Sequence, residues 1–147
     1  MFWFYLLVAA AAGAVIPVQA GVNSQLARLT GHPVVAAFVS LATGALALLV
    51  YCLALRPALP GRAALAAAPW WLWVGGLLGA FVVAATAAYA PRLGAATFIS
   101  VAVGGQMFAA LFLDHFGLVG FESRPAGWLR MLGAALLVAG VVLIRKF

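Results

Sequence analysis

The side chains best suited to chemistry in this sequence are uncharged amides inside apolar stretches. Gln19 and Asn23 are four residues apart, so both amides lie on one side of a helix. Pro17 removes a backbone hydrogen bond and is expected to kink that helix, which frees carbonyl oxygens. Stacked amides and free carbonyls can line a polar cavity. Alternatively, the amides only bond neighbouring helices together, and for Gln19 both interpretations stay open.

Further polar residues complete the predicted lining. Ser40 is one of them, although its hydroxyl can instead bond back to its own helix. Thr97 opens a stripe of small residues, with Ser100 and Gly104, that suits a close helix crossing. Gln106 is a second deep amide. The cavity is therefore predicted to be lined by Gln19, Asn23, Ser40, Thr97 and Gln106.

No arrangement typical of an enzyme accompanies these residues. The chain has no H-E-x-x-H motif, no glycine-rich phosphate loop and no G-x-S-x-G motif. His32 and His115 are predicted to lie on opposite sides of the membrane. Cys52 is the single cysteine, so it indicates neither a disulfide framework nor a metal site. We expect a protein that is not an enzyme and that uses no metal or cofactor.

The composition places these residues in a membrane. Of the 147 residues, 68% are hydrophobic and 7% are charged, whereas a soluble domain has about 25% charged residues. A globular core could not hide so much apolar surface, so lipid must solvate most of it. The net charge of +6 comes from basic residues scattered at the ends of apolar runs. Because they form no patch, they argue against a nucleic acid partner.

Charged residues divide the chain into runs that match membrane helices in length. Uncharged segments that reach the required length of about 20 residues extend over 1–27, 29–55, 63–91 and 93–113. A fifth run suffices if it begins near Pro125 and Arg130 snorkels to the interface. We therefore expect an all-α integral membrane protein with a single transmembrane domain over residues 1–147. Its five helices are predicted at about 3–27, 33–55, 69–90, 93–114 and 126–145.

The first apolar stretch ends in a small-x-small pattern before Gly21, as a secretory cleavage site does. A secretory signal begins with positive residues and has an apolar segment of about 7–15 residues. Here the first basic residue is Arg28. Cleavage would also leave four helices and nothing extracellular to deliver, so we expect the first helix to be retained.

Basic residues are balanced between the two sides of the membrane. With five helices, the side of residue 1 holds Arg56, Arg62, Arg124 and Arg130, and the other side holds Arg28, Arg92, Arg145 and Lys146. The positive-inside rule needs an excess on one side, and here there is none. Small counts can tie by chance, but an odd number of helices favours dual topology. Two copies would then form an antiparallel homodimer of ten helices with inverted symmetry.

Asp114 lies at the end of the fourth predicted helix. In an antiparallel homodimer, this end shares a side of the membrane with Arg28 of the partner subunit. An ion pair between Asp114 and Arg28 across the subunits is therefore predicted. The simpler interpretation is a solvated charge at a helix end, where the cost of a carboxylate is small.

Several segments of the chain together resemble one protein family. They are "IPVQAGVNSQL", "HPVVAAFVS", "PWWLWVGGLLGA", "PRLGAATFISVAVGGQ", "DHFGLVGF" and "RMLGAALLVAGVVL". In order and spacing they are similar to the YdcZ-like inner-membrane exporters of the drug/metabolite transporter superfamily. The resemblance covers nearly the whole chain. It implies a bacterial inner-membrane protein of five helices, working as an antiparallel pair or as a fused ten-helix relative, and it implies no particular substrate.

One departure from the related small multidrug-resistance transporters bears on mechanism. Those proteins use a glutamate in their first helix, where protons and cationic drugs compete. The first helix here has no carboxylate, and Gln19 lies in the comparable region. We therefore expect alternating access around a cavity at the dimer axis, with a neutral or zwitterionic small solute as substrate. The alternatives are a narrow channel and a helper that binds another membrane protein.

Overall fold

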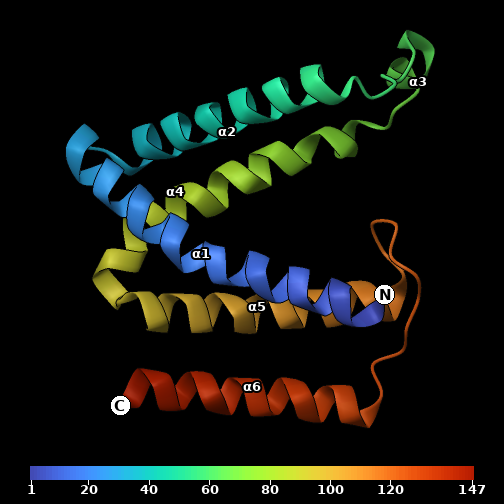
Figure 1. Cartoon of the computed structure of the whole chain (residues 1–147). Coiled ribbons are helices and arrows are strands. Elements are labelled where there is room, and N and C mark those ends of the chain that lie inside the picture. Colours follow the sequence, from blue (N-terminus) through green and yellow to red (C-terminus); the bar gives the residue numbers. More distant parts are fainter. The chain divides into compact units, whose positions relative to one another are not determined.

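The computed structural model describes all residues from Met1 to Phe147 and consists of helices and loops (Figure 1). The elements are α1 (Phe2–Thr30), α2 (Pro33–Leu55), α3 (Arg62–Ala66), the 3-10 helix η1 (Trp70–Val74), α4 (Gly75–Leu93), α5 (Ala95–Phe116) and α6 (Trp128–Lys146). They divide into two compact units, Met1–Pro91 and Arg92–Phe147.

The five predicted membrane helices are confirmed. Those long and apolar enough to cross a membrane are Phe2–Thr30, Pro33–Leu55, Trp70–Leu93, Ala95–Phe116 and Trp128–Lys146. The chain is all-α, as expected. The ends of the helices differ from the sequence-based bounds by up to three residues, and a short further helix is present. The first helix continues past residue 27 to Thr30, with Arg28 in its last turn where a cation suits the helix dipole. The short helix α3 is not predicted by the apolar pattern.

The turn between α1 and α2 is built from residues with strong local preferences. Gly31 follows α1 in the left-handed conformation, with φ 75°, which glycine adopts without a steric cost. His32 then caps α2, because its Nδ1 accepts the backbone N–H of Val34 at 3.2 Å. Pro33 occupies the first turn of α2, where a backbone N–H would have no acceptor within the helix, so its absence costs nothing. From this turn α1 and α2 diverge (Figure 1).

Each of these two helices has a narrow buried face of small side chains. On α1 this face consists of Ala20, Asn23 and Ser24, at spacings of three and four residues. On α2 it consists of Ala36 and Ala37. The helices pack against each other near their turn. Small side chains permit close approach, which is usual between membrane helices.

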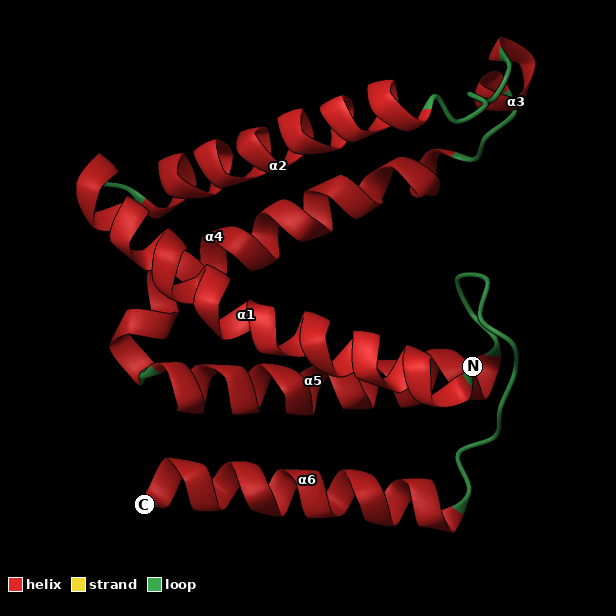
Figure 2. Cartoon of the chain, viewed as in Figure 1, coloured by secondary structure: helices red, strands yellow, loops and turns green.

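A surface segment joins α2 to α4 in the first unit. Arg56 follows α2 with φ 47° and ψ 51°, and the chain then passes through α3 to η1 and α4 (Figures 1 and 2). Residues of α2 and α4 also line a groove of about 470 Å³ that is almost entirely apolar. Its lining is Val34, Ala37, Phe38, Leu41, Ala42, Ala45, Ala80 and Ala84.

In the second unit, α5 and α6 run antiparallel and side by side, joined by residues 117–127 (Figure 2). Gly104 lies against α6, since a Cβ placed there would be 3.7 Å from Cγ2 of Val141 and 3.9 Å from Cδ2 of Leu137. Gly104 thus lies in the contact between α5 and α6, whereas the adjacent Gly105 has nothing within 4 Å of an added Cβ.

Large apolar side chains lie on the outside of the molecule. The buried hydrophobic residues are all alanines, and no large side chain is fully buried. Phe38 and Phe81, for example, are 71% and 73% exposed. Such a surface would aggregate in water but matches the acyl chains of a bilayer.

Candidate functional site

The two amides of α1 lie one turn apart but differ in burial. Asn23 belongs to the buried face of α1 and is 2% exposed. Gln19 lies at the edge of that face and is exposed. The amide of Asn23 therefore lies inside the contact between α1 and α2, and the amide of Gln19 lies beside that contact.

Most hydroxyl groups in the helices bond to their own backbone. Ser24 donates to the carbonyl of Ala20 at 2.7 Å, and Thr43 donates to that of Val39 at 2.8 Å. Such bonds satisfy a hydroxyl inside a membrane without a partner helix. The expected back-bond of Ser40 is not among them, although Ser40 is half-buried.

Asn23 likewise makes no hydrogen bond through its side chain. The side-chain bonds of α1 are those of Ser24 and Thr30. No fully buried polar atom in the structure lacks a partner. The amide of Asn23 therefore keeps a narrow opening to the surface, and its donors and acceptor are unused within the chain.

The remaining predicted lining residues lie in the second unit. Thr97 is half-buried near the start of α5, and its carbonyl accepts the hydroxyl of Ser100 at 3.0 Å. Gln106 is exposed further along the same helix. Because Gln19, Asn23 and Ser40 belong to the first unit, a cavity common to all five residues stays a prediction.

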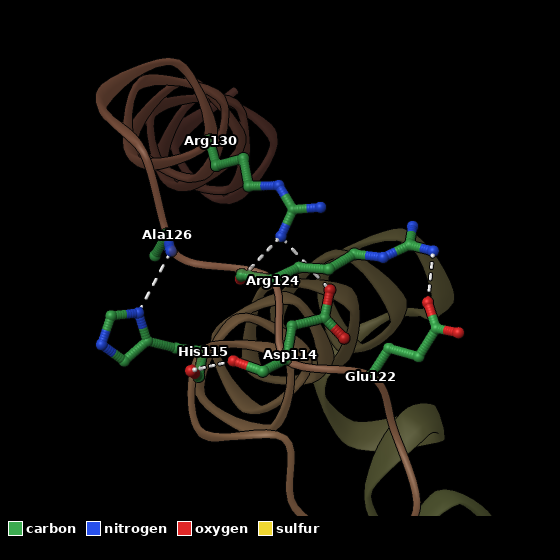
Figure 3. A network of polar contacts seen from close by, with 7 residues as sticks. Asp114, His115, Glu122, Arg124, Ala126 and Arg130 are labelled. Carbon is green, nitrogen blue, oxygen red and sulfur yellow. Dashed lines mark hydrogen bonds and ion pairs between the residues drawn. The ribbon is translucent and has the colours of Figure 1, made fainter.

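A polar cluster at the end of α5 is the feature that the sequence interpretation missed (Figure 3). Asp114 forms an ion pair with Arg130 of the same chain, with 3.4 Å between Oδ2 and Nη1. The same Nη1 also donates to the carbonyl of Arg124 at 3.2 Å. The backbone N–H of Arg124 in turn donates to the carbonyl of Asp114 at 2.7 Å. Asp114 thus holds the loop through both its side chain and its backbone.

His115 holds the other end of the same loop. Its Nδ1 accepts the backbone N–H of Ala126 at 3.1 Å, and its carbonyl accepts the Ser123 hydroxyl at 3.2 Å (Figure 3). Glu122 pairs with Arg124 at 3.2 Å on the exposed rim. The sequence places the opposite charges of Asp114 and Arg130 on either side of one short loop, and this pattern could have predicted the cluster.

These contacts bear on the predicted ion pair between subunits. Asp114 already has Arg130 as an intrachain partner, through one of its two carboxylate oxygens. Its side chain is 32% exposed, so the other oxygen can accept a further donor. The pair with Arg28 of the partner subunit stays a prediction.

Both acidic residues of the chain also line a single polar pocket beside this loop. The pocket measures about 420 Å³ and is lined by Asp114, Gly120, Phe121, Glu122 and Arg124. No group of three or more His, Cys, Asp or Glu side chains comes together as a metal site. Both carboxylates at this pocket are paired with arginines, one pair joining the ends of α5 and α6 and the other lying within the loop.

Comparisons with known proteins agree with the helical pattern. The family described as "Putative inner membrane exporter, YdcZ" matches residues 4–143, which confirms the resemblance noted from the sequence. "Inner membrane protein YdcZ" of Escherichia coli (strain K12) is 40% identical over 77 residues, covering 52% of this chain and 51% of that protein. The chain thus spans about half the length of this curated relative. No solved structure matches the chain. With five membrane helices and this match, the chain is a multi-pass inner-membrane protein that belongs to the YdcZ family.

Proposed function

We propose that the chain is a small-molecule transporter that works by alternating access as an antiparallel homodimer. Membership of an exporter family supports transport. Equal numbers of basic residues on the two sides of the membrane support dual topology. Two antiparallel copies would supply ten helices with an inverted two-fold axis, the symmetry that many transporters use for alternating access.

Glycines that have open space beside them in the single chain support a second copy of the chain as the partner. Gly13 and Gly21 of α1, and Gly75 and Gly79 of α4, have nothing within 4 Å of an added Cβ. Glycines repeated on one helix face commonly let another membrane helix approach closely. The single chain leaves these positions open, and the partner copy is the occupant we propose for them.

Asn23 is the observation that carries the proposed binding site. It is 2% exposed and makes no side-chain hydrogen bond within the chain. An unsatisfied polar group in a membrane costs several kcal/mol. A solute in the dimer cavity would satisfy the amides of Asn23 and Gln19, with Ser40, Thr97 and Gln106 completing the wall.

The placement of charge supports a neutral or zwitterionic substrate. The two carboxylates of the chain, Asp114 and Glu122, lie at the end of α5 and in the loop that follows. None lies in α1, where a proton-coupled cation exchanger of the multidrug type carries its glutamate. Amides both donate and accept hydrogen bonds, which suits hydroxyl, amide or carbonyl groups on a solute.

Transport into proteoliposomes tests the site. A panel of neutral and zwitterionic solutes is compared with hydrophobic cations. For a transported solute, the Gln19→Ala/Asn23→Ala variant should lose about tenfold or more in initial rate, because each lost hydrogen bond is worth about 1 kcal/mol. Gln25→Ala, which removes an exposed amide from the same helix, is the matched control. A wild-type rate in the double variant would refute the site.

Crosslinking tests the antiparallel arrangement. In a Cys52→Ser background, chains with D114C and chains with R28C are co-expressed and oxidised. They should crosslink to each other, because these positions share a side of the membrane only between antiparallel copies. Chains with D114C and R56C provide the control and should not crosslink. A crosslink in the control pair would show a parallel arrangement and refute the proposal.

A further inference from the structure

The segment between α2 and α4 differs from the rest of the chain in composition and exposure. This interfacial segment, residues 56–73, leaves α2 at Arg56, forms α3 and enters η1 at Trp70 (Figure 1). It joins the candidate membrane spans Pro33–Leu55 and Trp70–Leu93, and its tryptophans form the first turn of the second span. The segment therefore lies at the bilayer surface.

The interfacial segment carries basic charge without a counter-charge from this chain. Arg56 and Arg62 are its charged residues, and it contains no Asp or Glu. The two carboxylates of the chain are each paired with an arginine near the α5–α6 loop. Both guanidinium groups are exposed and have no carboxylate partner within the chain, so they are free to bind an anion from outside it.

Arg56 ends α2 in an uncommon backbone conformation. With φ 47° and ψ 51°, it adopts the left-handed conformation that glycine usually supplies after a helix. Its side chain is exposed at this position.

Exposed apolar side chains surround the two arginines in the sequence. Leu59 is 82% exposed, and Trp70 and Trp73 are 74% and 61% exposed. Tryptophan prefers the headgroup level of a bilayer, where its ring is half in lipid. Leucine inserts among the acyl chains, so the segment combines apolar anchors with unpaired cations.

We infer that the interfacial segment binds the headgroups of anionic phospholipids. A guanidinium group donates two parallel hydrogen bonds to a phosphate, which fixes the headgroup beside the arginine. The tryptophans and leucines then contact the acyl chains of the same leaflet. Two arginines at the surface of an anionic membrane predict a preference of about thirtyfold over zwitterionic lipid.

Tryptophan fluorescence measures this preference. In a Trp3→Phe/Trp128→Phe background, the remaining tryptophans are those of the interfacial segment. The protein is reconstituted in phosphatidylcholine vesicles that contain equal mole fractions of either brominated phosphatidylglycerol or brominated phosphatidylcholine. Brominated phosphatidylglycerol should quench more strongly at low salt, and the excess quenching should fall as salt is added.

Two charge variants decide whether the arginines are responsible. Arg56→Gln/Arg62→Gln should lose the excess quenching by the anionic lipid. Arg145→Gln/Lys146→Gln removes two charges at the other end of the chain and should keep it. Circular dichroism of each variant checks that the helices are intact. Equal quenching of the wild type by both lipids, or an excess that survives in the Arg56/Arg62 variant, would overturn the inference.

Discussion

Gly117→Ala should destabilise the protein more than Gly31→Ala, although both glycines end a helix in the left-handed conformation. Gly117 follows α5 with φ 62°, and Gly31 follows α1 with φ 75°. Their surroundings differ. A Cβ on Gly117 would lie 3.3 Å from both Cβ and N of Ser123, whereas nothing lies within 4 Å of a Cβ on Gly31. The two substitutions therefore separate a conformational cost from a packing cost.

The magnitudes follow from these distances. The left-handed conformation costs an alanine about 1–2 kcal/mol, and both variants lose this amount. Only Gly117→Ala must also displace the backbone at Ser123, and forced overpacking typically adds about 1–3 kcal/mol. The displacement strains the neighbouring bond between the Arg124 N–H and the Asp114 carbonyl, which is 2.7 Å long. We expect a total loss of about 2–5 kcal/mol for Gly117→Ala.

Thermal unfolding in a mild detergent measures the difference. A loss of 1 kcal/mol lowers the midpoint by about 2–4 °C for a chain of this size. Gly105→Ala is the control, because Gly105 lies within α5 with nothing near its Cβ. Alanine is the better helix former there, so the midpoint should stay or rise. Equal losses for Gly117→Ala and Gly31→Ala would refute the packing argument for the α5–α6 loop.

Three further predictions concern the same loop. A double-mutant cycle of Asp114→Asn and Arg130→Gln should give an interaction energy of about 0.2–1 kcal/mol, because the pair is partly exposed; a zero value in detergent unfolding would show that it contributes nothing. Val119→Gly should raise stability by up to about 1 kcal/mol in the same assay, since a β-branched residue with φ 56° is strained. His115→Phe should speed hydrogen exchange at the Ala126 amide, because it removes the acceptor of that N–H; an unchanged exchange rate would contradict the contact.

The membrane helices could be predicted because their cause is local. Uncharged runs of sufficient length require a helix, since every backbone polar group in lipid must be bonded within its own segment. Gly31 and Gly117 end helices through backbone conformations that glycine favours. The short helix α3 has no such signal, because it lies outside the bilayer and its five residues are too few for a periodic pattern.

The candidate site could be predicted only in part. The four-residue spacing of Gln19 and Asn23 predicts that both amides line the cavity, yet Gln19 is exposed and Asn23 is only 2% exposed. The difference comes from which side of α1 meets α2. Ser40 could bond back to its own helix or line the cavity, whereas Thr43, on the same helix, does bond back, to the carbonyl of Val39. Side-chain bonding depends on rotamers, which neighbouring helices select.

From the amino-acid sequence one can tell that this chain resides in a membrane, that it has five helices long enough to span one and that it belongs to the YdcZ family. Hydropathy and charge placement are sums over neighbouring residues, so they need no knowledge of the fold. The tertiary structure alone decided that Asn23 is enclosed, that Gly104 meets α6 and that Asp114 pairs with Arg130. Those outcomes depend on the way two helices pack and on the path of the α5–α6 loop. Both bring together residues that are distant along the chain.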